Sequence, residues 1–509
     1  MNYKFTVVLV LLFGTLACTK IGIDELKTAL GKNDVKEDPS NFELIGSIDI
    51  GTTGAAEISA YDPKTKRLFV VDNSTVNQID VLDLSNPGVP LLIANIDVQP
   101  YGGLVNSVAV NDGKLAAAIE AVNKQENGKV VVFDTKTYSK VAIINVGALP
   151  DMITFSPDGK FILTANEGEP NTTYTVDPLG SVSIISVKND YAVSTINFSS
   201  FGSQQALLQS KGLRVFGPNA SFGQDMEPEY ITISDDSRTA WVTLQENNAI
   251  AKIDLSSKAI TNIFPLGFKN YNGPGNAIDA TDRPLGTVAF NNAPVYGMYQ
   301  PDAIAVLMDN NKPYLFTANE GDAREYNSFA EEARIGSLPL DPVAFPNGAA
   351  LKAVTDLGRL NVTKTLGDPD ADGDYDALYS LGARSFSVWN GLTGDLLYDS
   401  KNELEIKANG ISAYDDDRSD NKGVEPEGIA LGTVNKKHLV FVGMERADAI
   451  AIYDVSNPLQ PRFLQILKTG DAPEGVLFIS QQDSPTKRSL LVISSENDGF
   501  VNIYAPVKL

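Results

Sequence analysis

The stretch LPDMITFSPDGKFILTANEGEP, residues 149–170, contains two β-rich apolar runs joined by a polar turn. It opens on Pro150 and Asp151, and its second run closes on Glu167. Four further stretches repeat this order of proline, acid, apolar run, turn, apolar run and glutamate. Their opening and closing acids are Glu229 and Glu246, Asp302 and Glu320, Glu427 and Glu445, and Glu474 and Glu496. Internal repetition of this kind indicates stacked supersecondary units.

Two weaker copies, residues 57–72 and 106–120, precede these five and bring the number of units to seven. A third apolar run follows each unit, and Val, Ile, Phe and Tyr dominate all of these runs, as is typical of β-strands. Short antiparallel sheets arranged radially are the blades of a β-propeller, and each blade has four strands. The sequence therefore predicts an all-β fold, a seven-bladed β-propeller.

The two ends of the chain predict how the propeller closes. The last unit ends five residues after Tyr504, so its fourth strand is missing. Residues 43–50, ELIGSIDI, alternate like a strand just ahead of the first unit. We expect residues 43–50 to complete the last blade, so that neither the first nor the last blade exposes a long edge. The propeller would then span residues 42–509.

The N-terminus predicts export. Lys4 precedes an apolar stretch, residues 5–13, that is too short to span a bilayer, so residues 1–17 are interpreted as a signal peptide. Cys18, the only cysteine, looks like the acylation site of a bacterial lipoprotein, with simple cleavage as the alternative. The polar residues 18–41 would form a tether. We expect an exported protein, lipid-anchored in the cell envelope and touching the membrane only through its anchor, with the side of the membrane left open.

Composition limits the classes of partner. The formal charge of −23 disfavours binding to nucleic acid or to anionic lipid heads and favours cations, although the same charge also keeps an exported protein soluble. The single histidine, His438, argues against histidine-rich zinc sites and Ser-His-Asp triads. Any metal would therefore be bound by oxygen. We expect a monomer that binds divalent cations.

The repeated acids are expected to converge. In a propeller blade the first strand lines the central channel and the second strand returns to the same face, so acids at the start of the first and the end of the second strand meet at one rim. The predicted inner ring is Asp151, Glu229, Asp302, Glu427 and Glu474, and beside it lie Glu167, Glu246, Glu320, Glu445 and Glu496. Such a ring binds cations, pairs with arginines, takes up protons or accepts backbone N–H bonds. The alternative is that each acid braces a loop between blades.

Long insertions are expected on the same face as these acids. They occupy residues 168–180, 198–227, 268–300, 321–383 and 401–424. Each joins the second strand to the third, or one blade to the next, and so starts from the acidic rim. Binding loops gather on one side of a rigid scaffold, so we expect function on this face.

One insertion contains an ion-binding pattern. In GDPDADGDYDALY the acids Asp368, Asp370, Asp372, Asp374 and Asp376 alternate around Gly373, and they present carboxylates at every second residue. The pattern is similar to the start of an EF-hand loop, but its twelfth position is Tyr379 instead of the bidentate Glu. We predict a calcium-stiffened loop of another kind, with a solvated acidic turn as the alternative.

The stretches FSPDGKFILTANEGEP, YLFTANEGDAREY and DPDADGDYDALYSLGARSFSVWN, together with EPEGIALG and GDAPEGVLFI, identify a family resemblance. Over nearly all of residues 42–509 the chain resembles bacterial choice-of-anchor I domain proteins, which are related to a mesenchyme-specific cell-surface glycoprotein. The resemblance implies a surface-displayed propeller held by a variable anchor. It supplies no catalytic residues to carry over.

Two functions remain open from the sequence. The first is a non-catalytic envelope lipoprotein whose acidic face binds calcium and a protein or glycan partner. The second is a calcium-dependent phosphoesterase of the propeller-phytase type, in which clustered metals activate water. Such an enzyme needs basic residues to clamp phosphate, and Arg324 and Arg446 are the candidates.

Overall fold

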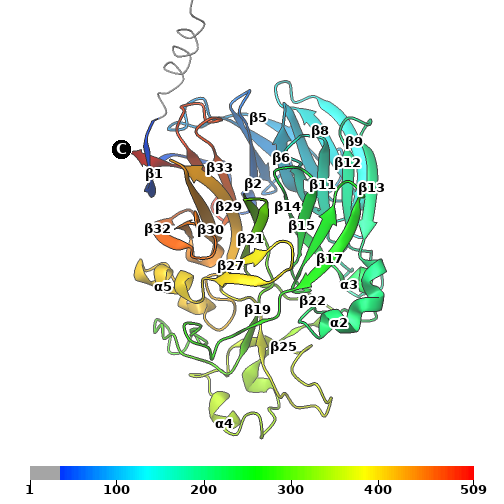
Figure 1. Cartoon of the computed structure of the whole chain (residues 1–509), viewed down its shortest axis with the longest axis vertical. Coiled ribbons are helices and arrows are strands. Elements are labelled where there is room, and N and C mark those ends of the chain that lie inside the picture. Colours follow the sequence, from blue (N-terminus) through cyan, green and yellow to red (C-terminus); the bar gives the residue numbers. More distant parts are fainter. Residues whose placement is uncertain (1–34) are drawn as a thin grey trace, which may run out of the picture.

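The structure, a computed structural model, describes residues 35–509, and this part of the chain is built mainly from β-strands (Figure 1). Seven four-stranded antiparallel sheets contain most of the strands. The first four sheets are β2 (Ala55–Asp62), β3 (Arg67–Asp72), β4 (Gln78–Asp83) and β5 (Leu91–Asp97); β6 (Val105–Asn111), β7 (Lys114–Ile119), β8 (Asn127–Asp134) and β9 (Lys140–Ala148); β10 (Pro150–Phe155), β11 (Phe161–Asn166), β12 (Ser181–Ser186) and β13 (Ala192–Asn197); and β14 (Pro228–Ile233), β15 (Thr239–Leu244), β16 (Ala249–Asp254) and β17 (Ala259–Pro265). The other three are β20 (Ile304–Asp309), β21 (Lys312–Asn319), β27 (Ser385–Asn390) and β28 (Leu396–Asp399); β29 (Pro426–Val434), β30 (Lys437–Met444), β31 (Ala449–Asp454) and β32 (Arg462–Lys468); and β33 (Pro473–Ile479), β34 (Leu490–Ser495), β35 (Phe500–Lys508) and β1 (Glu37–Asp49).

Each predicted repeat forms the first two strands of one sheet. The quoted stretch at residues 149–170, for example, gives β10 and β11, and the weaker copies give β2 with β3 and β6 with β7. The third strand of every sheet is the apolar run that follows the repeat. The predictions of an all-β fold and of a β-propeller are confirmed.

Buried apolar side chains join neighbouring sheets. Leu68 and Val70 of β3 pack in one cluster with Val492 of β34, which connects the first sheet to the last. Similar clusters connect each of the other neighbouring pairs. The first strands also contact one another in the order β2, β6, β10, β14, β20, β29 and β33, and β33 contacts β2. Burial of each large apolar side chain contributes about 1.5–3 kcal/mol, so these clusters hold the sheets together.

The strand β1 completes the last sheet, as residues 43–50 were predicted to do, but it is longer than predicted. It pairs antiparallel with β35 and begins at Glu37, within the region expected to be tether. The Glu37 carboxylate accepts the Ser489 N–H at 3.0 Å. Phe42 is fixed to the neighbouring sheet, because its N–H donates to the Gln465 side chain at 2.7 Å and its carbonyl accepts from that side chain at 3.0 Å. These contacts explain why β1 begins at Glu37, before the alternating residues 43–50.

A β-bulge opens the first strand in several sheets. The pairing register shifts between Pro150 and Ile153 in β10, Pro228 and Ile231 in β14, Pro426 and Ile429 in β29, and Pro473 and Gly475 in β33. Proline has no N–H to donate and is tolerated at a strand start, and a bulge redirects the side chains around it. The acid of each Pro-acid pair lies inside the bulge. The repeat therefore places a carboxylate where the strand bends.

The long insertions form additional elements at one end of the molecule, the lower end in Figure 1. They contain η1 (Ser199–Gln204), α2 (Gln205–Gln209), α3 (Phe222–Asp225), β18 (Phe268–Asn270), β19 (Tyr296–Met298), β22 (Glu325–Tyr326), β23 (Phe329–Ala330), β24 (Glu332–Arg334), η2 (Ile335–Ser337), α4 (Gly348–Leu351), β25 (Asn361–Thr363), β26 (Tyr379–Ser380), α5 (Glu403–Gly410) and η3 (Asp416–Arg418). A short helix η4 (Glu445–Ala447) joins β30 to β31. The insertions 268–300 and 321–383 share a small apolar core that includes Tyr271, Leu360 and Leu378.

The predicted signal peptide, Cys18 and the first part of the tether lie outside the described residues. Among the helices of residues 35–509, none has the length and apolar character needed to cross a membrane.

The contribution of β1 can be measured with one buried and one exposed side chain of the same strand. Phe42 is 1% exposed and packs edge-on against Phe441, with ring centroids 5.5 Å apart. We expect Phe42→Ala to lower the free energy of unfolding by about 3–5 kcal/mol in urea titrations, because it leaves a cavity between two sheets. The control Leu44→Ala, at a position 55% exposed, should change it by less than about 0.5 kcal/mol. Equal effects of the two substitutions would mean that β1 does not stabilise the last sheet.

Candidate metal site

A cavity of about 400 Å³ lies where the first strands of all seven sheets meet. We call it the acidic cavity, because its lining acids are Asp151, Glu229, Asp302, Glu320, Asp322, Glu427, Glu445 and Glu474. Its basic lining residues are Lys422 and Arg446. A second cavity of about 310 Å³ shares Ile58, Met152 and Tyr230 with it, so apolar side chains also line the acidic cavity. Acids from distant parts of the chain thus line one cavity.

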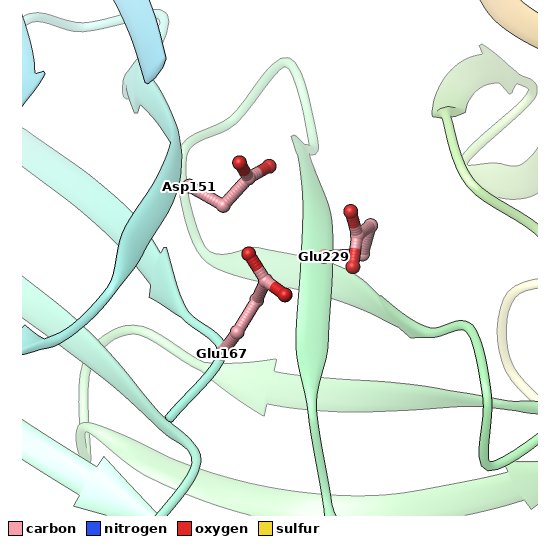
Figure 2. Close-up of side chains that lie close together, drawn as sticks. All are labelled: Asp151, Glu167 and Glu229. Carbon is pink, nitrogen blue, oxygen red and sulfur yellow. The ribbon is translucent and has the colours of Figure 1, made fainter. Parts of the chain in front are cut away.

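Three carboxylates at the junction of the third and fourth sheets form what we call the Asp151 group. Asp151 is in β10, Glu167 directly follows β11, and Glu229 is in β14, and each offers an oxygen within 4.8 Å of the others (Figure 2). Calcium takes oxygen ligands at about 2.3–2.6 Å, so ligands on opposite sides of one ion are about 5 Å apart. Among residues 35–509, no hydrogen-bond donor or basic group pairs with any of the three carboxylates.

The equivalent residues of the fifth and sixth sheets form a second set, the Asp302 group. It consists of Asp302, which precedes β20, Glu320, which follows β21, and Glu427 in β29, again with oxygens within 4.8 Å of one another. Here the Glu320 carboxylate has protein partners. Lys422 Nζ lies 2.6 Å from its Oε1, and the Gln245 amide donates to its Oε2 at 2.9 Å. The two groups therefore share their geometry and differ in their neighbours.

Burial and crowding raise the pKa of most of these carboxyls. Burial, followed by the neighbouring Glu169, raises the pKa of Asp151 to about 6. Burial and the nearby acids raise the pKa values of Glu167 and Glu229 well above their ordinary range. The same causes act on Asp302 and Glu427. A raised pKa favours the protonated carboxyl, and a divalent ion would compete with protons for the same oxygens.

The remaining predicted acids lie beside the acidic cavity or on its wall. Glu445 lines it, and burial with the neighbouring Glu320 raises its pKa to about 7. Glu246 is 7% exposed, and its Oε2 has no hydrogen-bond partner in the described chain. The charge of Glu496 raises the pKa of Glu474 and of Glu57, so these three acids are neighbours at the junction of the last and first sheets. Most of the predicted ring thus converges.

Arg324 does not reach the cavity, which contradicts its prediction as an anion clamp. Its side chain is 2% exposed, and its guanidinium pairs with Asp225 at 2.7 Å and with Glu227 at 2.8 Å. Because both partners are buried carboxylates, the guanidinium has a structural role between the insertions 198–227 and 321–383. Arg446 does line the acidic cavity, where it pairs with Glu445 at 2.9 Å and remains 37% exposed.

The aspartate-rich loop forms a separate acidic cluster within the insertion 321–383. Asp368, Asp370 and Asp376 offer oxygens within 4.8 Å of one another. Asp372 and Asp374 are not part of this cluster, and the N–H of Asp372 donates instead to the Asp368 carboxylate at 3.2 Å. Three of the five predicted ligands are therefore close enough to share one ion.

Sequence reasoning missed two residues of the acidic cavity, Asp322 and Lys422, and it left Glu57, which lies beside the cavity, out of the predicted ring. Asp322 lines the cavity two positions after Glu320, in the motif NEGD, and Lys422 lines it five positions before Glu427. Glu57 occupies the first-strand position of the first sheet, in a copy of the repeat that lacks the proline. The signal for Glu57 was its alignment with the other copies. No sequence pattern marked Lys422.

Comparison with known proteins gives one family and two curated relatives. Residues 57–458 match the model of the choice-of-anchor I domain. The mesenchyme-specific cell surface glycoprotein of Strongylocentrotus purpuratus is 28% identical over 343 residues, which cover 57% of this chain and 44% of that protein. Gigasin-3a of Magallana gigas is 30% identical over 182 residues, which cover 29% of this chain and 64% of that protein. The chain thus spans less than two thirds of the length of either relative.

Solved structures of similar shape have little sequence in common with the chain. Hydrazine synthase of Kuenenia stuttgartiensis aligns with a TM-score of 0.49 at 13% identity, covering 91% of this chain and 97% of that chain. The WD40 domain of coronin from Toxoplasma gondii aligns with a TM-score of 0.49 at 8% identity, covering 94% of this chain and 89% of that one. The fold assignment rests on the strand topology and not on these alignments.

Replacing Arg324 and replacing Arg446 should lower the free energy of unfolding by different amounts, because the two arginines have different roles. We expect Arg324→Met to lower the free energy of unfolding by about 3–5 kcal/mol, because it leaves Asp225 and Glu227 buried without their cation. Arg446→Met should cost less than about 1 kcal/mol, because Arg446 is partly exposed and solvent screens its ion pair. Urea unfolding of both variants tests this difference. A small effect at Arg324 would contradict the structural role assigned to it.

Proposed function

The chain belongs to the choice-of-anchor I domain family, as its sequence motifs predict, and from this premise we propose that it is an exported, lipid-anchored envelope protein whose acidic cavity binds divalent cations. Calcium is the preferred ion, because the ligands are carboxylate oxygens and the described chain brings no histidine or cysteine to the cavity. Through the bound ion, or directly, the same face binds a protein or glycan partner. The protein acts without catalysis.

The observation that carries this proposal is the Asp151 group. Three carboxylates with oxygens within 4.8 Å of one another repel each other unless a cation or protons lie between them. The described chain supplies no cation to this group, although it supplies one arginine, Arg324, to the neighbouring buried acids Asp225 and Glu227. A divalent ion from solution would satisfy all three carboxylates at once.

The architecture that we infer for this function is a ring of seven blades closed by β1. In such a ring each first strand faces the axis, and the bulge at its start directs an acid into the cavity. The insertions at the same end surround the acids and provide a surface for a partner. The first curated relative is, by its name, a cell surface glycoprotein, which fits a role outside the cytoplasm.

Calcium should stabilise the purified protein. At a free concentration 100-fold above the dissociation constant, one bound ion adds about 2.7 kcal/mol to the free energy of unfolding, which raises the melting temperature. We expect the double variant Asp151→Asn, Glu229→Gln to lose the shift that arises in the cavity, and Asp368→Asn, Asp376→Asn to lose only the contribution of the loop. An unchanged melting temperature of the wild-type protein at millimolar calcium would contradict cation binding.

The alternative of a calcium-dependent phosphoesterase has one structural point in its favour, because Arg446 lines the same cavity as the carboxylates. Arg324 is no longer a candidate clamp, and Lys422 is engaged by Glu320. We therefore expect no turnover of a generic phosphoester substrate with added calcium. Turnover that disappears in the double variant Glu320→Gln, Glu445→Gln would replace the binding function with a catalytic one.

A further inference from the structure

The Asp151 group and the Asp302 group occupy equivalent positions in the repeat. Each takes one acid from the start of a first strand, one from the end of the second strand, and one from the first strand of the next sheet. Their oxygens satisfy the same distance limit of 4.8 Å. If carboxylates alone determined cation binding, the acidic cavity would take an ion at both groups.

A side-chain cation contacts one acid of the Asp302 group. Lys422 Nζ lies 2.6 Å from Glu320 and 3.1 Å from Glu425, and the Lys422 side chain is only 12% exposed. Glu320 belongs to the Asp302 group and also to a neighbouring set with Glu425 and Glu445. The ammonium therefore sits at the acid that joins these two sets, where a bound metal ion would need the same oxygens.

Within residues 35–509, no such side chain lies at the Asp151 group. Gln224 stands five residues before Glu229, as Lys422 stands five residues before Glu427, and its neutral amide donates to the Asp177 carbonyl at 2.7 Å. Lys124, the basic residue whose charge acts on Asp151, pairs instead with Glu120 at 3.6 Å. Glu246, more than nine-tenths buried and with an unpartnered Oε2, adds its negative charge to Glu167 and Glu229.

We propose that Lys422 is a built-in cation that takes the place of a metal ion at the Asp302 group, so that the acidic cavity binds a single divalent ion, at Asp151, Glu167 and Glu229. This inference rests on the proposed function and specifies it. The lysine ammonium brings one positive charge and up to three N–H donors, whereas the Asp151 group has room for a hard ion with oxygen ligands. Removing the ammonium should convert the Asp302 group into a second ion site.

The test counts calcium ions bound per chain by equilibrium dialysis and isothermal titration calorimetry. All proteins carry Asp368→Asn and Asp376→Asn, so that the aspartate-rich loop does not contribute ions. We expect one ion in this background, two after Lys422→Met, and one after Lys422→Arg, which keeps a cation of similar reach. One ion after Lys422→Met would overturn the proposal, as would two ions in the background protein.

A second pair of variants tests the assignment without altering Lys422. In the same background, Asp151→Asn with Glu229→Gln should remove the bound ion, whereas Glu320→Gln with Glu427→Gln should retain it. Loss of the ion in the second double variant and not in the first would overturn the proposal while leaving cation binding intact. No bound ion in the background protein would instead reject the proposed function itself, so the two failures are distinguishable.

The melting temperature of the Lys422→Met variant, with and without calcium, tests the proposal independently of ion counting. Without calcium, Lys422→Met leaves Glu320 and Glu425 without their shared ammonium, so we expect a lower melting temperature than in the background protein. Added calcium should restore most of this loss in Lys422→Met and have a smaller effect on Lys422→Arg. Equal calcium-induced shifts in the two variants would contradict occupation of an ion site by the lysine.

Discussion

Apolar burial between neighbouring sheets is the constraint on which the acidic cavity depends. Clusters such as the one containing Leu68 and Val492 hold the first strands against each other, and the bulge at the start of β10, β14, β29 and β33 contains the acid that lines the cavity. Like charges would separate if the strands were free to move. Because the packing clusters fix the strands, the carboxylates cannot move apart. Their repulsion can be reduced only by proton uptake, by pairing with protein groups or by ion binding.

In two repeats an acid lies on each side of the proline, and the two acids have different roles. The acid before the proline stabilises the structure, and the acid after it lines the cavity. Glu227 and Glu425 precede Pro228 and Pro426, and each pairs with an arginine or lysine. Glu229 and Glu427 follow the same prolines and line the acidic cavity. The bracing role considered for every repeated acid thus belongs mainly to the residue before the proline. The residue after it lies in the bulge and faces the cavity.

The sequence was sufficient to predict the sheets and most of the acids that line the acidic cavity, because both follow from a repeat with strand periodicity. The repeat fixes where strands begin, and the propeller geometry brings their first residues together. It did not reveal the partners of Arg324, since Asp225 and Glu227 lie about a hundred residues away and their pairing depends on how an insertion folds. Lys422 was missed for the same reason, as no local pattern distinguishes it from a solvent-exposed lysine. The start of β1 at Glu37 depends on Gln465 and Ser489, which are equally remote.

Three equivalent junctions between neighbouring sheets differ in what the described chain supplies to their crowded carboxylates. At the Asp302 group a lysine supplies the positive charge. At the junction of the last and first sheets, Glu57 accepts an amide N–H from Asn73 at 2.9 Å, and burial followed by Glu496 raises its pKa to about 8. At the Asp151 group the described chain supplies neither a donor nor a cation, and the neighbouring first-strand position holds Asn106, whose amide donates to the Pro150 carbonyl instead. The Asp151 group keeps three oxygens within reach of one ion, and it is the one of these three groups in which no carboxylate has a donor or a basic partner among the described residues.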